Sequence, residues 1–289
     1  MFKGSYTALI TPFIESKVDY EAFESLIEFQ IENGTHGLVP SGTTGESPTL
    51  NNNEHDAVIE FCIKKASNRV KIMAGTGSNS TIEAIERTQH AEKSGADAAL
   101  IMTPYYNKPN QEGIYRHYEA IHNNSSIPIF LYNIPGRSIV DISDDTIKRL
   151  MDLPRIVGIK DATANLERPK AITEMNPDFI QFSGEDATAV DFNRLGGTGC
   201  ISVSANVVPK QCSEIQELCF DNKFDDADKI QEKLLPLHDV MFCEPSPQPA
   251  KYAMSEMKMC QNILRLPLIS VSEANKGRIS QELKKLELI

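Results

Sequence analysis

Eight short runs of β-branched and other apolar residues recur along the chain as far as residue 206, with helical patterns between them. Most of these runs are continuously apolar, which is typical of strands covered on both faces in a parallel sheet. Eight successive β/α units predict an α/β fold, the closed (β/α)8 or TIM barrel, and a doubly wound sheet, which usually has fewer strands, is the alternative. The predicted strands are residues 5–10, 37–40, 70–75, 98–103, 128–133, 156–160, 179–183 and 199–204.

The helical patterns continue after the strands stop. Between the strands, residues 20–33 carry an apolar stripe, and Ser80 and Glu83 have the spacing of a capping box for a helix that ends near Ser94. We expect a catalytic barrel over residues 1–222 and a C-terminal helical domain over residues 223–289, joined without a flexible linker. The later predicted helices are residues 208–220, 221–242, 250–263 and 273–288.

The charge balance argues against two classes of partner. The chain has 29 lysines and arginines against 40 aspartates and glutamates, so its net charge of −11 disfavours nucleic acid and anionic membranes. No run of about 18 apolar residues and no signal peptide are present, so we expect no membrane span. The six cysteines form no C-x-x-C pair and no histidine stands at zinc-ligand spacing, which predicts reduced thiols in the cytoplasm and no metal.

Lys160, at the end of the sixth predicted strand, is a polar residue that the strand pattern does not explain. Side chains alternate along a strand, so Ile156, Gly158 and Lys160 are expected to share one face. If Val157 and Ile159 face the surrounding helices, Lys160 points into the mouth of the barrel, and Gly158 leaves room beneath it.

A lysine in that position is poorly hydrated, and desolvation favours the neutral amine. A neutral amine attacks a ketone and forms a Schiff base. The alternative is a strand-end lysine that reaches out to water or pairs with a carboxylate such as Asp161.

A glycine-rich segment, Ser-Gly-Thr-Thr-Gly-Glu-Ser at residues 41–47, follows the second predicted strand. Its two glycines permit a tight turn in which consecutive N–H groups converge on an anion, and the hydroxyls of Thr43 and Thr44 add donors or a proton relay. It is not a P-loop, because no G-K-[ST] follows at the required spacing. An ordinary glycine-rich turn is the alternative.

Tyrosines and an arginine stand at the ends of the fourth and fifth predicted strands. Tyr105 and Tyr106 follow the fourth strand, Tyr132 lies in the last part of the fifth, and Arg137 lies just beyond. Hydrogen-bonded tyrosines can relay protons and a guanidinium suits a carboxylate, although packing tyrosines and a surface arginine are the alternatives. With the barrel lysine and the glycine-rich loop, these residues indicate an enzyme that condenses or cleaves 2-keto acids.

These motifs resemble the Schiff-base aldolase family that contains dihydrodipicolinate synthase and N-acetylneuraminate lyase. The resemblance covers essentially the whole chain, including the helical tail. The segments that carry it are residues 42–46, 74–77, 104–106, 132–137, 157–161, 244–245 and 264–267.

The resemblance implies a lyase that condenses pyruvate with L-aspartate 4-semialdehyde in the diaminopimelate and lysine pathway, without a cofactor. Lys160 would form an imine with pyruvate, and the backbone amides of Thr43 and Thr44 would hold the pyruvate carboxylate. Tyr132, Thr43 and Tyr106 would form the proton relay, with Tyr132 as the direct donor and acceptor.

The resemblance also implies a homo-oligomer, a dimer of dimers in which Tyr106 reaches across the tight interface into the neighbouring site. Arg137 would receive the carboxylate of the semialdehyde at the mouth of the barrel. Gly184 and Ile201 would line the pocket, largely through their main chain.

A feedback site for L-lysine at the dimer interface is a further implication. Pro48 and Asn52 depart from the pattern of strongly inhibited members, and Glu83 has the capping-box position as a structural alternative. The residues that match the inhibited type are Ser47, His55, Asn79, Glu83 and Tyr105.

Two other functions remain open from the sequence. One is another pyruvate-dependent aldolase that acts on N-acetylneuraminate or a 2-keto-3-deoxy sugar acid, although sialate lyases of this family lack an arginine at the position of Arg137. The other is a non-catalytic, ligand-binding barrel, in which Lys160 would be chemically silent.

Overall fold

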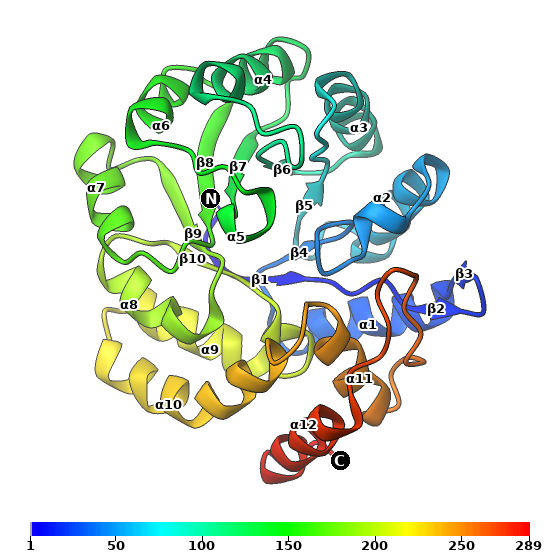
Figure 1. The fold of residues 1–289 in the computed structure, drawn as a ribbon. Coiled ribbons are helices and arrows are strands. Elements are labelled where there is room, and N and C mark those ends of the chain that lie inside the picture. Colours follow the sequence, from blue (N-terminus) through cyan, green and yellow to red (C-terminus); the bar gives the residue numbers. More distant parts are fainter. Residues whose placement is uncertain (1) are drawn as a thin grey trace.

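The computed structural model describes residues 2–289, in which the eight predicted strands form a closed parallel barrel (Figure 1). The strand order is β1-β10-β9-β8-β7-β6-β5-β4, and β1 closes the ring by pairing with both β10 and β4. The (β/α)8 barrel is therefore confirmed over the doubly wound sheet. The barrel strands are β1 (Gly4–Ala8), β4 (Gly37–Val39), β5 (Lys71–Gly75), β6 (Ala98–Met102), β7 (Ile129–Asn133), β8 (Ile156–Asp161), β9 (Ile180–Ser183) and β10 (Gly199–Ser202).

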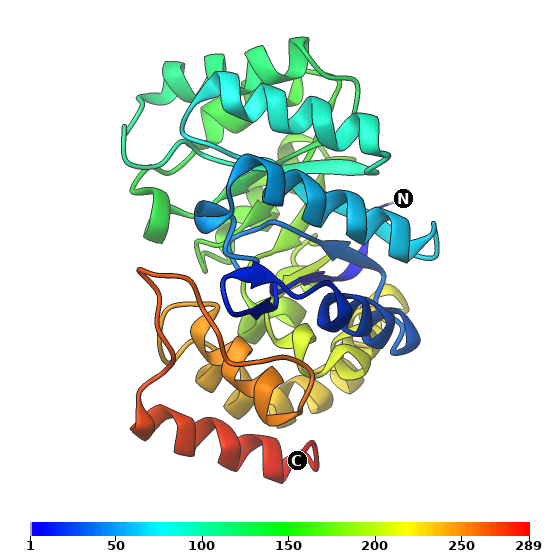
Figure 2. The ribbon, with the colours of Figure 1, turned by 90° about the vertical axis from the view of Figure 1, so that its right-hand side faces the viewer.

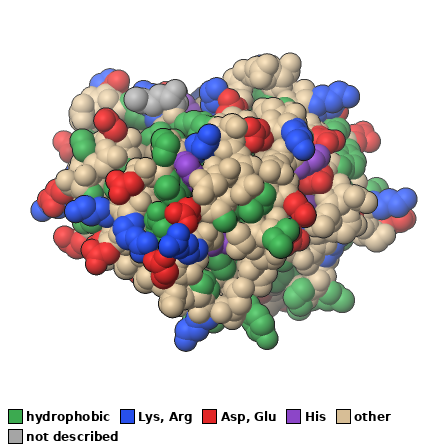
Figure 3. All heavy atoms as spheres, turned by 90° about the horizontal axis from the view of Figure 1, so that it is seen from above, with side chains coloured by type: hydrophobic (Ala, Val, Ile, Leu, Met, Phe, Trp, Pro, Cys, Tyr) green, Lys and Arg blue, Asp and Glu red, His purple; other side chains and the backbone are tan. Residues whose placement is uncertain are grey.

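Helices surround this ring of strands (Figure 1). None of the helices in residues 2–289 is both long enough and apolar enough for a membrane span. On the face drawn in Figure 3, acidic and basic side chains are intermixed, without a continuous basic surface. The helices between strands are α1 (Tyr20–Glu32), α2 (Asn52–Ala66), α3 (Thr81–Ser94), α4 (Gln111–Asn123), α5 (Pro135–Ser138), α6 (Asp144–Met151), α7 (Glu167–Met175) and α8 (Ala189–Arg194), and α9 (Pro209–Phe220) follows β10.

An aromatic layer fills the inside of the barrel. Tyr6 meets the ring of Phe182 edge-on, with centroids 4.9 Å apart, and Phe130 lies 5.8 Å from Phe182. Tyr132 lies two residues after Phe130 in β7, toward the carboxyl end of the strand, and it pairs with Lys160 of β8. The mouth of the barrel therefore has an apolar floor, and Lys160 stands above it.

The C-terminal helices share one apolar core with the helices of the barrel. In Figure 2 the last helix lies along the lower edge of the molecule, beyond the two helices that precede it. These helices are α10 (Phe224–Met241), α11 (Gln248–Glu256) and α12 (Glu273–Lys285). The shared core includes Leu26 and Ile27 of α1, Ile215 of α9, Leu237 of α10, Met254 of α11 and Leu283 of α12.

Local structure departs from the prediction at one helix end and at one hairpin. The helix predicted over residues 250–263 ends at Glu256, because Lys258 adopts a left-handed backbone (φ 62°) and the N–H of Met259 bonds to the carbonyl of Met254. A two-stranded hairpin, β2 (Phe13–Ile14) with β3 (Lys17–Val18), was not predicted, because strands of two residues have no periodicity to detect.

The predicted capping box at α3 is only half formed. The Ser80 hydroxyl accepts the N–H of Glu83 at 3.4 Å, as expected. The Glu83 carboxylate does not return to the N–H of Ser80, because it binds the hydroxyl of Ser78 and the guanidinium of Arg87 instead. A complete capping box is present at α2, between Asn51 and Glu54.

Strand β8 contains an irregularity that corrects the predicted faces. Ile129 of β7 pairs with Ile156, but the next residue, Phe130, pairs with Gly158, so Val157 is the extra residue of a β-bulge. The bulge turns Ile156 toward the helix side and Val157 toward the barrel interior, so their predicted faces are wrong.

Beyond the bulge the predicted alternation holds. Ile159 packs in the core between strands and helices, and Lys160 lies inside the barrel. A Cβ atom on Gly158 would lie 2.5 Å from the Phe130 ring and 2.4 Å from the Ile180 carbonyl oxygen. Gly158 therefore makes room for the aromatic floor beneath Lys160.

Replacing Gly158 with alanine is expected to lower the free energy of unfolding by about 1–3 kcal/mol, because the added methyl group overpacks the floor. Thermal unfolding of the purified variant measures this loss. Gly277→Ala is the matched control, since a Cβ there meets no atom within 4 Å and the site lies in α12. Equal melting temperatures for Gly158→Ala and the wild type would contradict the packing described here.

Candidate functional site

Lys160 is buried at the mouth of the barrel, with 5 % of its surface exposed. It is the fifth residue of β8, and it pairs with Tyr132 of β7 and Phe182 of β9. Its Nζ atom lies 4.5 Å from the centre of the Tyr132 ring. The strand register therefore brings these two predicted residues together.

The ion pair with Asp161, which the sequence left open for Lys160, is not formed. The Asp161 carboxylate is directed to the other side of the strand, where it accepts hydrogen bonds from Asn133 at 3.2 Å and Arg168 at 3.3 Å. It also accepts the N–H of Thr163 at 3.0 Å. These partners occupy Asp161 and leave the Lys160 amine inside the barrel.

The network behind Lys160 was not found from the sequence. Asn133 follows Tyr132 directly, as Asp161 follows Lys160, and its amide also donates to Asp141 at 2.7 Å. Arg168 of α7 donates to the same Asp141 carboxylate at 2.7 Å. The network ties together the ends of the two strands that carry Tyr132 and Lys160. The only sequence signal of this network was the polar residue that directly follows each of Tyr132 and Lys160.

The glycine-rich loop forms a tight turn after β4. The N–H of Gly45 bonds to the carbonyl of Gly42 and the N–H of Glu46 to the carbonyl of Thr43, each at 3.1 Å. Within residues 2–289 the N–H groups of Thr43 and Thr44 donate to no protein acceptor. Two adjacent N–H groups are thus available to an anion at the mouth of the barrel.

Tyr106 is not brought to Lys160 within one chain. Its side chain is 90 % exposed, and its backbone is left-handed with φ 70°. The turn is held because Asn107 donates its N–H to the carbonyl of Tyr105 and its side-chain amide to the carbonyl of Asn79, both at 2.8 Å. A strained backbone that presents a fully exposed ring is typical of a functional position.

Arg137 lies on the exposed side of the short helix α5, two residues after its first residue, Pro135. Its guanidinium donates to the carbonyl oxygen of Ser246 at 3.2 Å. A segment of the C-terminal part of the chain, 109 positions after Arg137 in sequence, therefore orients this cation.

Gly184 and Ile201 lie at and near the ends of the next two strands. The N–H of Gly184 bonds to the carbonyl of Asp161 at 2.6 Å, and a Cβ atom there would lie 2.6 Å from that of Ala162, so only glycine fits. Ile201 is fully buried inside the barrel.

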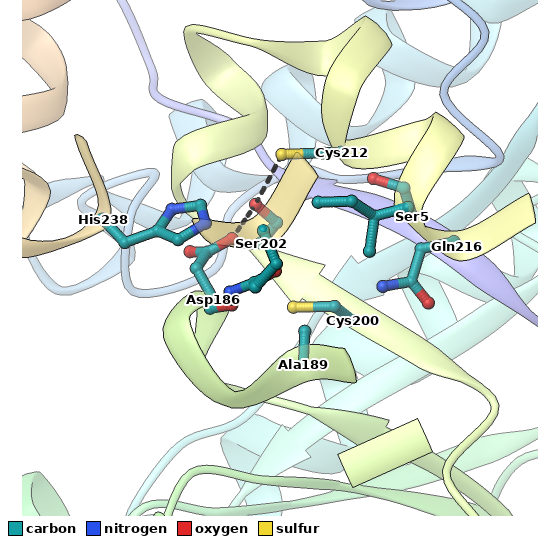
Figure 4. A pocket seen from close by; sticks show the side chains of 10 residues that line it. Ser5, Asp186, Ala189, Cys200, Ser202, Cys212, Gln216 and His238 are labelled. Carbon is teal, nitrogen blue, oxygen red and sulfur yellow. Dashed lines mark hydrogen bonds between the residues drawn. The ribbon is translucent and has the colours of Figure 1, made fainter. Parts of the chain in front are cut away.

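A small cavity lies behind β10, beside the turn after Ile201 (Figure 4). The buried carboxylate of Asp186 binds the hydroxyl of Ser202 and accepts the N–H groups of Val203 at 3.0 Å and Ser204 at 3.2 Å. The cavity measures about 10 Å³, enough for about one water molecule, so it is too small for a substrate.

The residues matched to an effector site lie in the segments after β4, β5 and β6 and in the helices α2 and α3. Arg87 of α3 binds the Glu83 carboxylate at 2.8 Å and the Asn52 side chain at 3.3 Å. His55 is fully buried, with Nε2 2.9 Å from the carbonyl of Gly75. Burial, and then the Arg87 charge, lower the pKa of His55. Ser47 is also buried, and Asn79 and Tyr105 are half-buried.

A metal centre has no donor set in the part of the chain described. Residues 2–289 contain no group of three or more His, Cys, Asp or Glu side chains placed to hold an ion. All six cysteines are free thiols, and burial raises the pKa of every one of them.

Comparison with known proteins gives one consistent result. A model of the "Dihydrodipicolinate synthetase family" matches residues 1–286. The 4-hydroxy-tetrahydrodipicolinate synthase of Parvibaculum lavamentivorans is 56 % identical over 280 residues, which are 96 % of each chain.

Solved structures agree with the sequence relatives. The dihydrodipicolinate synthase of Acinetobacter baumannii, complexed with pyruvate, is 44 % identical with a TM-score of 0.98, and the match covers 100 % of both chains. The enzyme of Cyanidioschyzon merolae with lysine bound is 35 % identical with a TM-score of 0.96, over 100 % of this chain and 99 % of that one.

Proposed function

The chain belongs to the dihydrodipicolinate synthetase family, and we propose that it condenses pyruvate with L-aspartate 4-semialdehyde. This is the reaction of a 4-hydroxy-tetrahydrodipicolinate synthase, a lyase that opens the diaminopimelate and lysine pathway. The observation that carries the proposal is Lys160, buried beside Tyr132 at the carboxyl end of β8 without an ion pair to Asp161.

The chemistry begins when the neutral Lys160 amine attacks the ketone carbon of pyruvate and water leaves, giving an imine. The free N–H groups of Thr43 and Thr44 suit the pyruvate carboxylate. Loss of a methyl proton turns the imine into an enamine, whose carbon attacks the aldehyde of the second substrate. The amine of that substrate then displaces Lys160 by cyclisation and frees the enzyme.

Proton transfer in these steps falls to Tyr132, Thr43 and Tyr106. Because Tyr106 is exposed on a strained turn, we propose that its hydroxyl enters the site of a second chain. The working enzyme would then be a homo-oligomer built from such pairs, a dimer of dimers. The six free thiols support activity in the cytoplasm.

Substrate selection is assigned to the rim of the site. Arg137, exposed and oriented by Ser246, is proposed to receive the carboxylate of the semialdehyde. Gly184 and Ile201 would line the pocket. A lyase for N-acetylneuraminate or a 2-keto-3-deoxy sugar acid is disfavoured, because a guanidinium at this rim suits a second carboxylate.

Borohydride reduction in the presence of pyruvate is expected to inactivate the enzyme and to attach one reduced pyruvate to Lys160, because the imine is trapped as a secondary amine. Peptide mass spectrometry locates the modified residue. Lys251, also fully buried, is the internal control and should stay unmodified, as should the Lys160→Ala variant. An unlabelled Lys160 would favour a non-catalytic barrel.

Tyr106→Phe is expected to reduce turnover by roughly 10²-fold without loss of thermal stability, because a hydroxyl of the relay is lost while the exposed ring is kept. Mixing it with Lys160→Ala chains tests whether the hydroxyl acts across the interface. Hybrid dimers would contain one complete site and regain part of the activity. A mixture that is no more active than either variant alone would contradict the shared site.

We further propose that L-lysine binds near Ser47, His55, Asn79, Glu83 and Tyr105, and that it binds weakly. A lysine complex is known for the relative from Cyanidioschyzon merolae. In this chain the guanidinium of Arg87 already neutralises Glu83, so a second cation gains less there.

Arg87→Leu is accordingly expected to lower the lysine concentration for half-inhibition by about fivefold, the equivalent of about 1 kcal/mol of competing ion pair. Initial rates at increasing L-lysine measure it, with Arg194→Leu, a surface ion-pair variant on α8, as the control. Flat curves for the wild type and for Arg87→Leu would remove the effector site.

A further inference from the structure

We propose that Glu46 and Lys251 are positioning residues through which the C-terminal helices hold the Thr43–Thr44 loop in the shape that binds pyruvate. The inference rests on the proposed function, since it names a support for the pyruvate site. It adds two residues that lie 205 positions apart in the sequence and do not face the substrate.

Both side chains of this pair are fully buried. The Lys251 ammonium, on α11, donates to one oxygen of the Glu46 carboxylate. The other oxygen accepts the main-chain N–H of Arg265 at 3.0 Å. The C-terminal part of the chain therefore binds both oxygens of a carboxylate that belongs to the glycine-rich loop.

Glu46 transmits its position to the loop through the backbone. Its φ of 56° is left-handed, and its N–H bonds to the carbonyl of Thr43 at 3.1 Å. On the other side of the turn, the Thr11 hydroxyl donates to the carbonyl of Gly45 at 2.7 Å. A shift of the Glu46 carboxylate thus moves the residues whose N–H groups are free at the site.

The side chains around the Glu46–Lys251 pair hold it in one arrangement. Phe13 lies under both cations, with the Lys251 Nζ atom 4.2 Å and the Arg265 guanidinium 4.4 Å from its ring centre. That guanidinium binds both oxygens of Glu54, at 2.7 and 2.6 Å. Residues that follow the loop are therefore bound to the same C-terminal segment.

A buried ion pair is poor evidence for stability, because taking two charges out of water offsets most of their attraction. A fully paired carboxylate does, however, hold its own side chain and backbone in one position. The same C-terminal segment also orients Arg137 through the Ser246 carbonyl. It thus contacts Arg137 directly and the Thr43–Thr44 loop through Glu46.

The test compares kinetic constants and thermal stability in the full-length enzyme. Glu46→Gln is expected to raise the KM for pyruvate by roughly 10- to 100-fold while the KM for the semialdehyde changes by less than about threefold, because only the pyruvate loop is displaced. The pyruvate concentration that half-saturates borohydride inactivation should rise in parallel. Arg278→Gln, which removes a surface ion pair of the same segment, is the control.

Two further variants separate positioning from stability. The double variant Glu46→Leu/Lys251→Met removes both buried charges. Its melting temperature should be close to that of the wild type, but its KM for pyruvate should stay raised. Thr11→Val, which keeps the pair, should also raise that KM because it removes the other anchor of the turn.

The outcomes distinguish this inference from the proposed function. If the wild-type enzyme did not convert pyruvate and the semialdehyde, both the proposed function and this inference would be overturned. An active wild type, with a pyruvate KM unchanged in the Glu46 variants and in Thr11→Val, would overturn the positioning role alone.

Discussion

Closure of eight strands into one ring is the constraint on which the site depends, because it brings together residues from far apart in the chain. The seam at β1 leaves no room for a side chain at two glycine positions. A Cβ atom on Gly37 would lie 2.2 Å from the Tyr6 ring, and one on Gly199 would lie 2.3 Å from the carbonyl oxygen of Gly4. Once this seam closes, the carboxyl ends of all the strands meet at one mouth.

The buried charged groups near that mouth are of two kinds. Supporting charges are paired with opposite ones, as in the Glu46–Lys251 pair and in the contacts of Arg168 with Asp161 and Asp141. Lys160 is excluded from such pairing, although a carboxylate is its direct neighbour in sequence. The barrel therefore keeps an amine without an ion-pair partner over an apolar floor, and ion pairs around it hold the neighbouring strands and loops.

The sequence was sufficient for the architecture because fully buried strands are recognisable as apolar runs. It was not sufficient for the bulge at Val157, since one extra apolar residue leaves an apolar run unchanged. The end of α11 at Glu256 was missed because its left-handed turn uses Lys258 and not a glycine. Lys160 and Tyr132 were proposed as site residues because polar residues at strand ends are conspicuous, and Thr43 was proposed because it lies between two glycines of a loop. The partners Arg168 and Lys251 were not, because one sequence does not show which distant charges meet.

A crystal structure of the enzyme soaked in pyruvate tests the central claim most directly. The account predicts continuous density between the Lys160 Nζ atom and the ketone carbon, with the carboxylate on the N–H groups of Thr43 and Thr44. Pyruvate bound elsewhere, or a Lys160 amine that stays free or turns outward in the presence of saturating pyruvate, would contradict it.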